Sequence, residues 1–210
     1  MKTLKVSLFI LMLLIRIQSY GYESNLELTH DVQNLVDWVV SSSDNQNLPF
    51  IIIDKKETKV FMFSSDGKIY GATTALMGIT IGDETTAGVG KKKLSDIRIE
   101  ERTTPAGRFE AQLGINPKQS EMLWIDYESG VSMHPVVTSN ASEHRLQRLS
   151  SANVAEHRIT YGCINVPIAF YKEFVHTTYK NSAGIVYILP ENHSILAVFG
   201  PEAARFSKRK

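Results

Sequence analysis

The chain has 210 residues, of which 43% are hydrophobic and 21% charged, as in an ordinary soluble globular protein with one sizeable core and an appendage. Its formal net charge of +1 falls to −2 when three basic residues of a predicted leader, Lys2, Lys5 and Arg16, are left out. This near-neutral balance gives no reason to expect nucleic acid as a partner, because phosphate binding needs a basic face.

Residues 1–21 have the pattern of a signal peptide. Lys2 and Lys5 precede an almost unbroken apolar run from Val6 to Ile15, and small residues surround a cleavage position near Gly21. The apolar run is short for a transmembrane helix, and Arg16 ends it. We therefore expect an exported protein of the periplasm or cell wall, which meets a membrane only through this leader if the leader stays uncleaved.

Residues 22–48 are predicted to form a helical segment and a linker. Apolar residues recur at helical spacing from Leu28 to Val40, and Thr29 is a candidate N-cap. From residue 49 the pattern changes to short β-rich runs, with an Asp66-Gly67 step that is typical of a hairpin turn. The strands expected from these runs are Phe50–Ile53, Lys59–Phe63, Lys68–Tyr70, Ala72–Ile81, Phe109–Leu113, Met122–Tyr127 and Val131–His134.

The later part of the chain carries fewer strands. A long polar insertion, Val136–Arg158, contains a short predicted helix at Glu143–Leu149. A helix at Ala169–Tyr179 and a last strand at Gly184–Leu189 follow, and residues 200–210 are predicted to be a basic C-terminal tail that is frayed at Lys208–Lys210. The fold class expected is mainly β with a few helices, in a domain of residues 49–199. The glycines and lysines of Gly82–Lys93 lack phosphate-loop spacing and predict a solvated loop.

Cys163 is the only cysteine, so no internal disulfide is possible. A lone cysteine is often a small buried hydrophobe. In an exported protein, however, an unpaired thiol calls for an explanation, and Gly162 before it lets backbone N–H groups approach a ligand. These features favour a cysteine nucleophile, which needs a nearby base to deprotonate it.

His134 is the favoured base among six histidines. It ends a predicted strand, shares a face with Ser132, and is followed by Pro135, which stiffens the exit. The carbonyl of His134 or Pro135 can orient the second ring nitrogen. His144 is the alternative, but it falls in a polar insertion without a strand to hold it, and a catalytic base must be held rigidly.

The motifs Ser132-Met133-His134, Thr160-Tyr161-Gly162-Cys163-Ile164-Asn165 and Thr104-Pro105-Ala106-Gly107-Arg108-Phe109 resemble those of the catalytic domain of L,D-transpeptidases, cysteine enzymes of bacterial peptidoglycan. The resemblance covers roughly Phe50 to Pro190. The cysteine motif itself is similar to that of a Tyr-Gly-Cys-Ile-Asn subgroup of the family. The resemblance implies a β-sandwich of that family, with a long insertion before the cysteine motif. Two features depart from the family pattern: Tyr161 replaces a second histidine, and the interval from His134 to Thr160 is longer than usual, whereas His144 lies nearer the common interval.

The resemblance implies acyl transfer. Cys163 would attack the carbonyl before the terminal D-residue of a tetrapeptide stem, and His134 would take the thiol proton and return it to the leaving amine. Backbone N–H groups at Tyr161, Gly162 and Cys163 would form the oxyanion hole. Tyr161 can contact substrate but not act as a base near neutral pH, since a phenol has a pKa near 10. Asn165 and Arg158 are substrate-side or loop-fixing candidates, with buried structural roles equally open.

The implied partners are peptidoglycan stem peptides, with no cofactor and a monomeric state. A hydrolase or L,D-carboxypeptidase of the same fold remains an alternative, because water can replace the acceptor amine. A silent wall-binding domain, with Tyr161 marking lost activity, is another. A zinc site at His134, His144 and His157 is disfavoured because the sequence lacks HxxxH or CxxC spacing, and no metal site is predicted.

Overall fold

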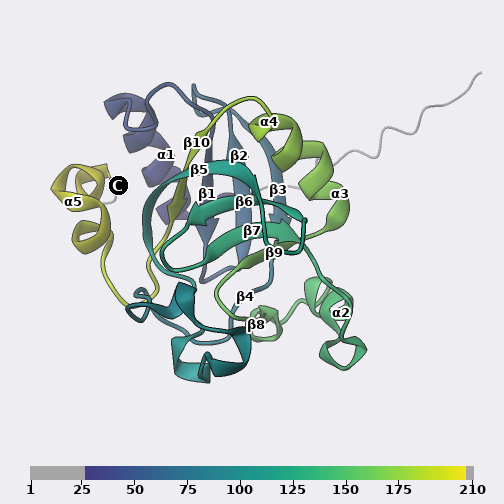
Figure 1. Ribbon diagram of the computed structural model, residues 1–210. Coiled ribbons are helices and arrows are strands. Elements are labelled where there is room, and N and C mark those ends of the chain that lie inside the picture. Colours follow the sequence, from purple (N-terminus) through teal and green to yellow (C-terminus); the bar gives the residue numbers. More distant parts are fainter. Residues whose placement is uncertain (1–26, 207–210) are drawn as a thin grey trace, which may run out of the picture.

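The computed structural model describes residues 27–206, so the predicted leader and Lys208–Lys210 lie outside the described residues. An eight-stranded mixed sheet dominates, in the order β3-β2-β1-β10-β5-β6-β7-β9 (Figure 1). Its strands are β1 (Phe50–Asp54), β2 (Lys59–Phe63), β3 (Ile69–Thr74), β5 (Gly107–Ile115), β6 (Glu121–Asp126), β7 (Val131–Pro135), β9 (Ile164–Val166) and β10 (Gly184–Ile188). The predicted fold class, mainly β with a few helices, is confirmed.

The helices lie outside this sheet. They are α1 (His30–Ser42), α2 (Arg145–Leu149), α3 (Ile168–Phe170), α4 (Thr177–Tyr179) and α5 (Ile195–Phe206), with a π-helical stretch at Tyr171–His176 joining α3 to α4. Short 3₁₀ turns occur at Val89–Lys91, Leu94–Asp96, Ile99–Glu101, Ala141–Glu143 and Val154–His157. None of the helices between residues 27 and 206 is long and apolar enough to cross a membrane.

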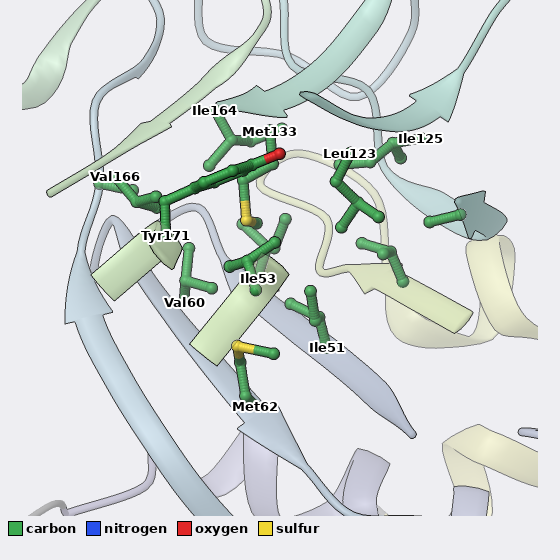
Figure 2. Close-up of a cluster of buried hydrophobic side chains, with 14 of the residues drawn as sticks. Ile51, Ile53, Val60, Met62, Leu123, Ile125, Met133, Ile164, Val166 and Tyr171 are labelled. Carbon is green, nitrogen blue, oxygen red and sulfur yellow. The ribbon is translucent and has the colours of Figure 1, made fainter. Parts of the chain in front are cut away.

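The sheet changes direction along β5, which belongs to both of its halves. Residues 107–111 of β5 pair with β10, and residues 112–115 pair with β6. The two halves therefore face each other across one core, as the layers of a sandwich do. Figure 2 shows this core, in which Ile51, Ile53, Val60 and Met62 of one half pack with Leu123, Ile125, Met133, Ile164 and Val166 of the other and with Tyr171.

The opposite face of β1, β2 and β10 carries a second core, because alternate residues of a strand point to opposite faces. Phe50, Ile52 and Tyr187 pack there against the apolar face of α1 and against α5. Thr29 caps α1, accepting a hydrogen bond from Val32 N at 3.4 Å, so the predicted cap and amphipathic helix are confirmed. Helices α1 and α5 lie side by side on this face (Figure 1).

Two elements differ from expectation. The strand-like run expected from Ala72 to Ile81 is divided, because β3 ends at Thr74 and a separate β4 (Met77–Gly78) pairs in parallel with β8 (Arg158–Thr160). Residues 200–206, assigned to the C-terminal tail, belong to α5, which bends at Gly200. The strand predicted to be the last of the chain is confirmed as β10, which lies inside the sheet between β1 and β5.

Candidate active site

Cys163 lies in a tight loop between β8 and β9 that one side chain holds together. The hydroxyl of Thr160 donates to Cys163 O at 2.6 Å and accepts from Gly162 N at 3.1 Å. Gly162 has a φ of +122°, which residues with a Cβ rarely adopt. Cys163 as a residue remains partly exposed.

The segment Thr103–Gly107, which overlaps the Thr104–Phe109 motif of the sequence, packs against this loop. The buried Thr104 hydroxyl donates to Gly162 O at 2.8 Å and accepts from Gly78 N at 2.9 Å. A Cβ on Gly162 would lie 2.8 Å from Thr103 O. Glycine is therefore required at position 162 both by its backbone angle and by the close approach of this segment.

The pairing of β7 with β9 brings the predicted base to the cysteine. The two strands are parallel, with Met133 opposite Ile164 and His134 opposite Asn165. One residue earlier, Ser132 faces Cys163, and its Oγ is 3.5 Å from Cys163 Sγ. Met133 points the other way, into the core. The predicted shared face of Ser132 and His134 is confirmed.

The imidazole of His134 is held in one tautomer. Its Nδ1 is 2.8 Å from Pro135 O, and because a carbonyl can only accept, Nδ1 carries the proton. The neutral ring therefore has its lone pair at Nε2, which lies 3.1 Å from Nδ2 of Asn165. Of the two carbonyls considered from the sequence, Pro135 is the one that orients the ring.

Cys163 and His134 each favour the charged form of the other. Burial raises the pKa of the Cys163 thiol, but the neighbouring His134, followed by Ser132, lowers it by more, so the net pKa lies below that of an ordinary thiol. Burial lowers the pKa of His134, but Cys163 raises it above its ordinary value. The arrangement can thus supply a thiolate next to an imidazolium.

Asn165 is buried and has a contact at each end of its side chain. Its Nδ2 is 3.1 Å from His134 Nε2, and its Oδ1 accepts from Arg145 Nη1 at 2.6 Å. Its backbone exchanges two hydrogen bonds with Leu76. Asn165 is therefore bonded to the base, to α2 of the insertion and to the segment before β4.

Tyr161 is half-buried, and its ring lies under the guanidinium of Arg102, whose central carbon is 3.9 Å from the ring centroid. Three backbone N–H groups of this loop were expected to form an oxyanion hole. Gly162 N donates to Thr160, so the N–H groups of Tyr161 and Cys163 are the ones left without a partner among residues 27–206.

Arg158 is held by the fold. Its Nη2 donates to Lys55 O at 2.6 Å and forms an ion pair with Glu191. Lys55 is fully buried, and its Nζ donates to Asp83 at 2.8 Å and to two backbone carbonyls. Arg158 also lines a cavity of about 610 Å³ with Ile79 and Ile81, but neither Cys163 nor His134 borders that cavity.

The other histidines are dispersed. His144 is exposed on the insertion with a φ of +48°. His157 is buried, and its ring contacts the Thr58 hydroxyl and, at 3.2 Å, Ser151 O. No group of three metal-binding side chains occurs in the part of the chain that the structure describes. The zinc set of His134, His144 and His157 therefore does not assemble.

Two residues of the site were not recognised in the sequence as contributing to it. Arg145 belongs to a helix that the pattern did predict, but only folding places that helix against Asn165. Thr104 carried no signal beyond its motif, and its contact with Gly162 spans 58 residues. Ser132, by contrast, was already placed on the strand face of His134 by the alternation of the sequence.

No protein-family model and no curated protein matches the chain. Among solved structures it is similar to the catalytic domain of the L,D-transpeptidase of Enterococcus faecium, with 19% identity, 68% of this chain and 98% of that chain covered, and a TM-score of 0.40.

It is also similar to the helical cell shape determining protein Pgp2 of Campylobacter jejuni (14% identity, 85% of this chain and 61% of that chain, TM-score 0.47) and to an L,D-transpeptidase of Stackebrandtia nassauensis (13%, 77% and 65%, 0.42). The chain spans less than two thirds of these last two. At such identities no activity follows for this chain.

Proposed function

We propose that this protein is an exported L,D-transpeptidase, which forms a thioester with a peptidoglycan tetrapeptide stem and passes the acyl group to an amine. The observation that carries the proposal is the convergence of Cys163 with His134, which the pairing of β7 with β9 brings together, with His134 Nδ1 fixed by Pro135 O at 2.8 Å and the imidazole lowering the pKa of the thiol. A nucleophile, an oriented base and free backbone donors are the parts that acyl transfer needs.

In the first half of the reaction, Cys163 Sγ attacks the carbonyl before the terminal D-residue, after His134 Nε2 has taken the thiol proton. The negative charge that develops on the carbonyl oxygen is stabilised by the N–H groups of Tyr161 and Cys163. The C–N bond then breaks, and His134 returns the proton to the departing amine. The product is an acyl thioester on Cys163 and a free D-amino acid.

In the second half, the amine of another stem attacks the thioester carbonyl. His134, neutral again, takes a proton from this amine, the C–S bond breaks, and the proton returns to the sulfur. Water in place of the amine would give a free tripeptide, which is the outcome of an L,D-carboxypeptidase. The partial exposure of Cys163 is compatible with either acceptor.

Three further features belong to the proposal. Tyr161 shapes the substrate side of the thiol, held in place by Arg102, and places the chain in a Tyr-Gly-Cys-Ile-Asn subgroup. The protein is exported by its leader to the periplasm or cell wall, where its substrate occurs. It works there as a monomer without a cofactor.

The test is incubation of the mature protein with disaccharide tetrapeptides, followed by mass spectrometry of products and intact protein. Crosslinked dimers and a transient adduct on Cys163 are expected. If tripeptides are the only products, the reaction is hydrolysis rather than transpeptidation. Identical behaviour of the protein and its Cys163→Ala variant, with no adduct and no product, would leave a silent wall-binding domain as the remaining reading.

A further inference from the structure

The amide of Asn165 has only one possible orientation in this site. Oxygen and nitrogen of an amide can be exchanged by a half-turn, so the choice must come from the partners. Arg145 Nη1 lies 2.6 Å from one end of the amide, and a guanidinium can only donate. That end is therefore the oxygen, and the NH₂ group faces His134 Nε2 at 3.1 Å.

This orientation acts on the protonation of the base. Because His134 Nδ1 already carries a proton toward Pro135 O, a second proton would go to Nε2. An N–H at Nε2 would then face the N–H of Asn165, which is two donors against each other. With the lone pair at Nε2, by contrast, the contact is a hydrogen bond. The Asn165 amide thus favours the neutral base.

We propose that Arg145 is a positioning residue, which fixes the Asn165 amide and so keeps His134 as an oriented, neutral base. The inference rests on the proposed function, in which that base accepts a proton in both halves of the reaction. It also gives a role to the insertion between β7 and β8, since α2 supplies Arg145. The side chain of Arg145 is 12% exposed and is itself held by Glu143 Oε2, 2.5 Å from its Nε.

Two charged or titratable groups within residues 27–206 act on His134, namely Cys163 and Arg145, and Arg145 is in turn paired with Glu143. Arg145 opposes a charge on His134 in two ways, by its own positive charge and through Asn165. Cys163 favours that charge. Removing Arg145 should therefore shift the balance toward the imidazolium.

The test measures the rate of Cys163 alkylation by iodoacetamide against pH, since this rate follows the thiolate and the protonation of its partner. In Arg145→Ala the amide of Asn165 is free to turn its oxygen toward Nε2, and the upper titration of the profile should move up by about 0.5 to 1 pH unit. Arg145→Lys keeps a donor and should restore the wild-type profile.

Arg148 provides the matched control. It lies on the same helix, carries the same charge and donates to Glu143 O and Glu156 O, with no contact to Asn165 or His134. The Arg148→Ala profile should overlay that of the wild type. If Arg145→Ala overlays it too, the inference is wrong. Should Arg145→Ala fail to fold, Asn165→Asp replaces the donor by an acceptor and must shift the same titration upward, or the inference also fails.

Alkylation needs no peptidoglycan, so the positioning role of Arg145 and the proposed transpeptidase function can be refuted independently of each other. A shifted profile in a protein that never acts on disaccharide tetrapeptides would refute the function and keep the positioning role. With an active protein, Arg145→Ala should lower kcat and leave KM nearly unchanged, because Arg145 acts through Asn165. A higher KM with an unshifted profile would instead make Arg145 a substrate contact and overturn the inference.

Discussion

Replacing Thr104 by valine tests whether this residue secures the cysteine loop. The change keeps the shape of the side chain and removes its hydroxyl, which joins Gly78 N at 2.9 Å and Gly162 O at 2.8 Å. Thr104 is fully buried, so both backbone groups would be left without a partner. An unsatisfied buried group costs about 1 to 3 kcal/mol, and two of them, partly relaxed, predict a loss of roughly 2 to 4 kcal/mol in the free energy of unfolding.

Urea denaturation followed by circular dichroism measures this loss. With a slope of about 2 kcal/mol per M, the midpoint should fall by about 1 to 2 M. Thr103→Val is the matched control, because Thr103 is also buried but its hydroxyl has no hydrogen bond to a residue in the range 27–206. If Thr104→Val is no less stable than Thr103→Val, the loop is not held in the way described.

Two other predictions concern stability. Gly162→Ala brings a Cβ to 2.8 Å from Thr103 O at a φ of +122°, so it should lower the free energy of unfolding by roughly 2 to 4 kcal/mol and abolish adduct formation. Gly88→Ala is the control, because its Cβ would have open space around it at a φ of +76°. In the same urea titration it should lose only about 1 kcal/mol. Burial raises the pKa of Asp83, but Lys55 and three backbone N–H groups lower it well below its usual range, so its contribution to stability is present above about pH 5 and lost as the pH falls through the acid range. Asp83→Asn should thus be less stable at neutral pH and less dependent on pH below 5, and parallel curves of urea midpoint against pH for the two proteins would contradict this.

The features that local patterns predict are those that neighbouring residues determine. Helix α1 and its Thr29 cap follow from spacing within one helix, and the shared face of Ser132 and His134 follows from strand alternation. The mainly β class follows from the same short runs. Each of these depends on contacts over a few residues, which a single sequence displays directly.

The contacts that complete the site are long-range and leave no local trace. The parallel pairing of β7 with β9 joins segments on either side of the insertion, and only this register sets His134 beside Asn165. Arg158 is a further case. The sequence left a substrate-side, a loop-fixing or a buried structural role open for it, and its guanidinium is bound to Glu191 and Lys55 O. These partners lie 33 and 103 residues away in the chain, so no local pattern indicates them.

The most direct test of the central claim asks which histidine serves Cys163. His134→Gln and His144→Gln should be compared with the wild type for the rate at which a disaccharide tetrapeptide forms an adduct, followed by intact-protein mass spectrometry. Because strand pairing sets His134 beside Cys163, where it lowers the pKa of the thiol, whereas His144 is exposed on the insertion, His144→Gln should form the adduct at the wild-type rate. His134→Gln should be slower by a factor of at least about 100. Adduct formation by His134→Gln at the wild-type rate would contradict the account.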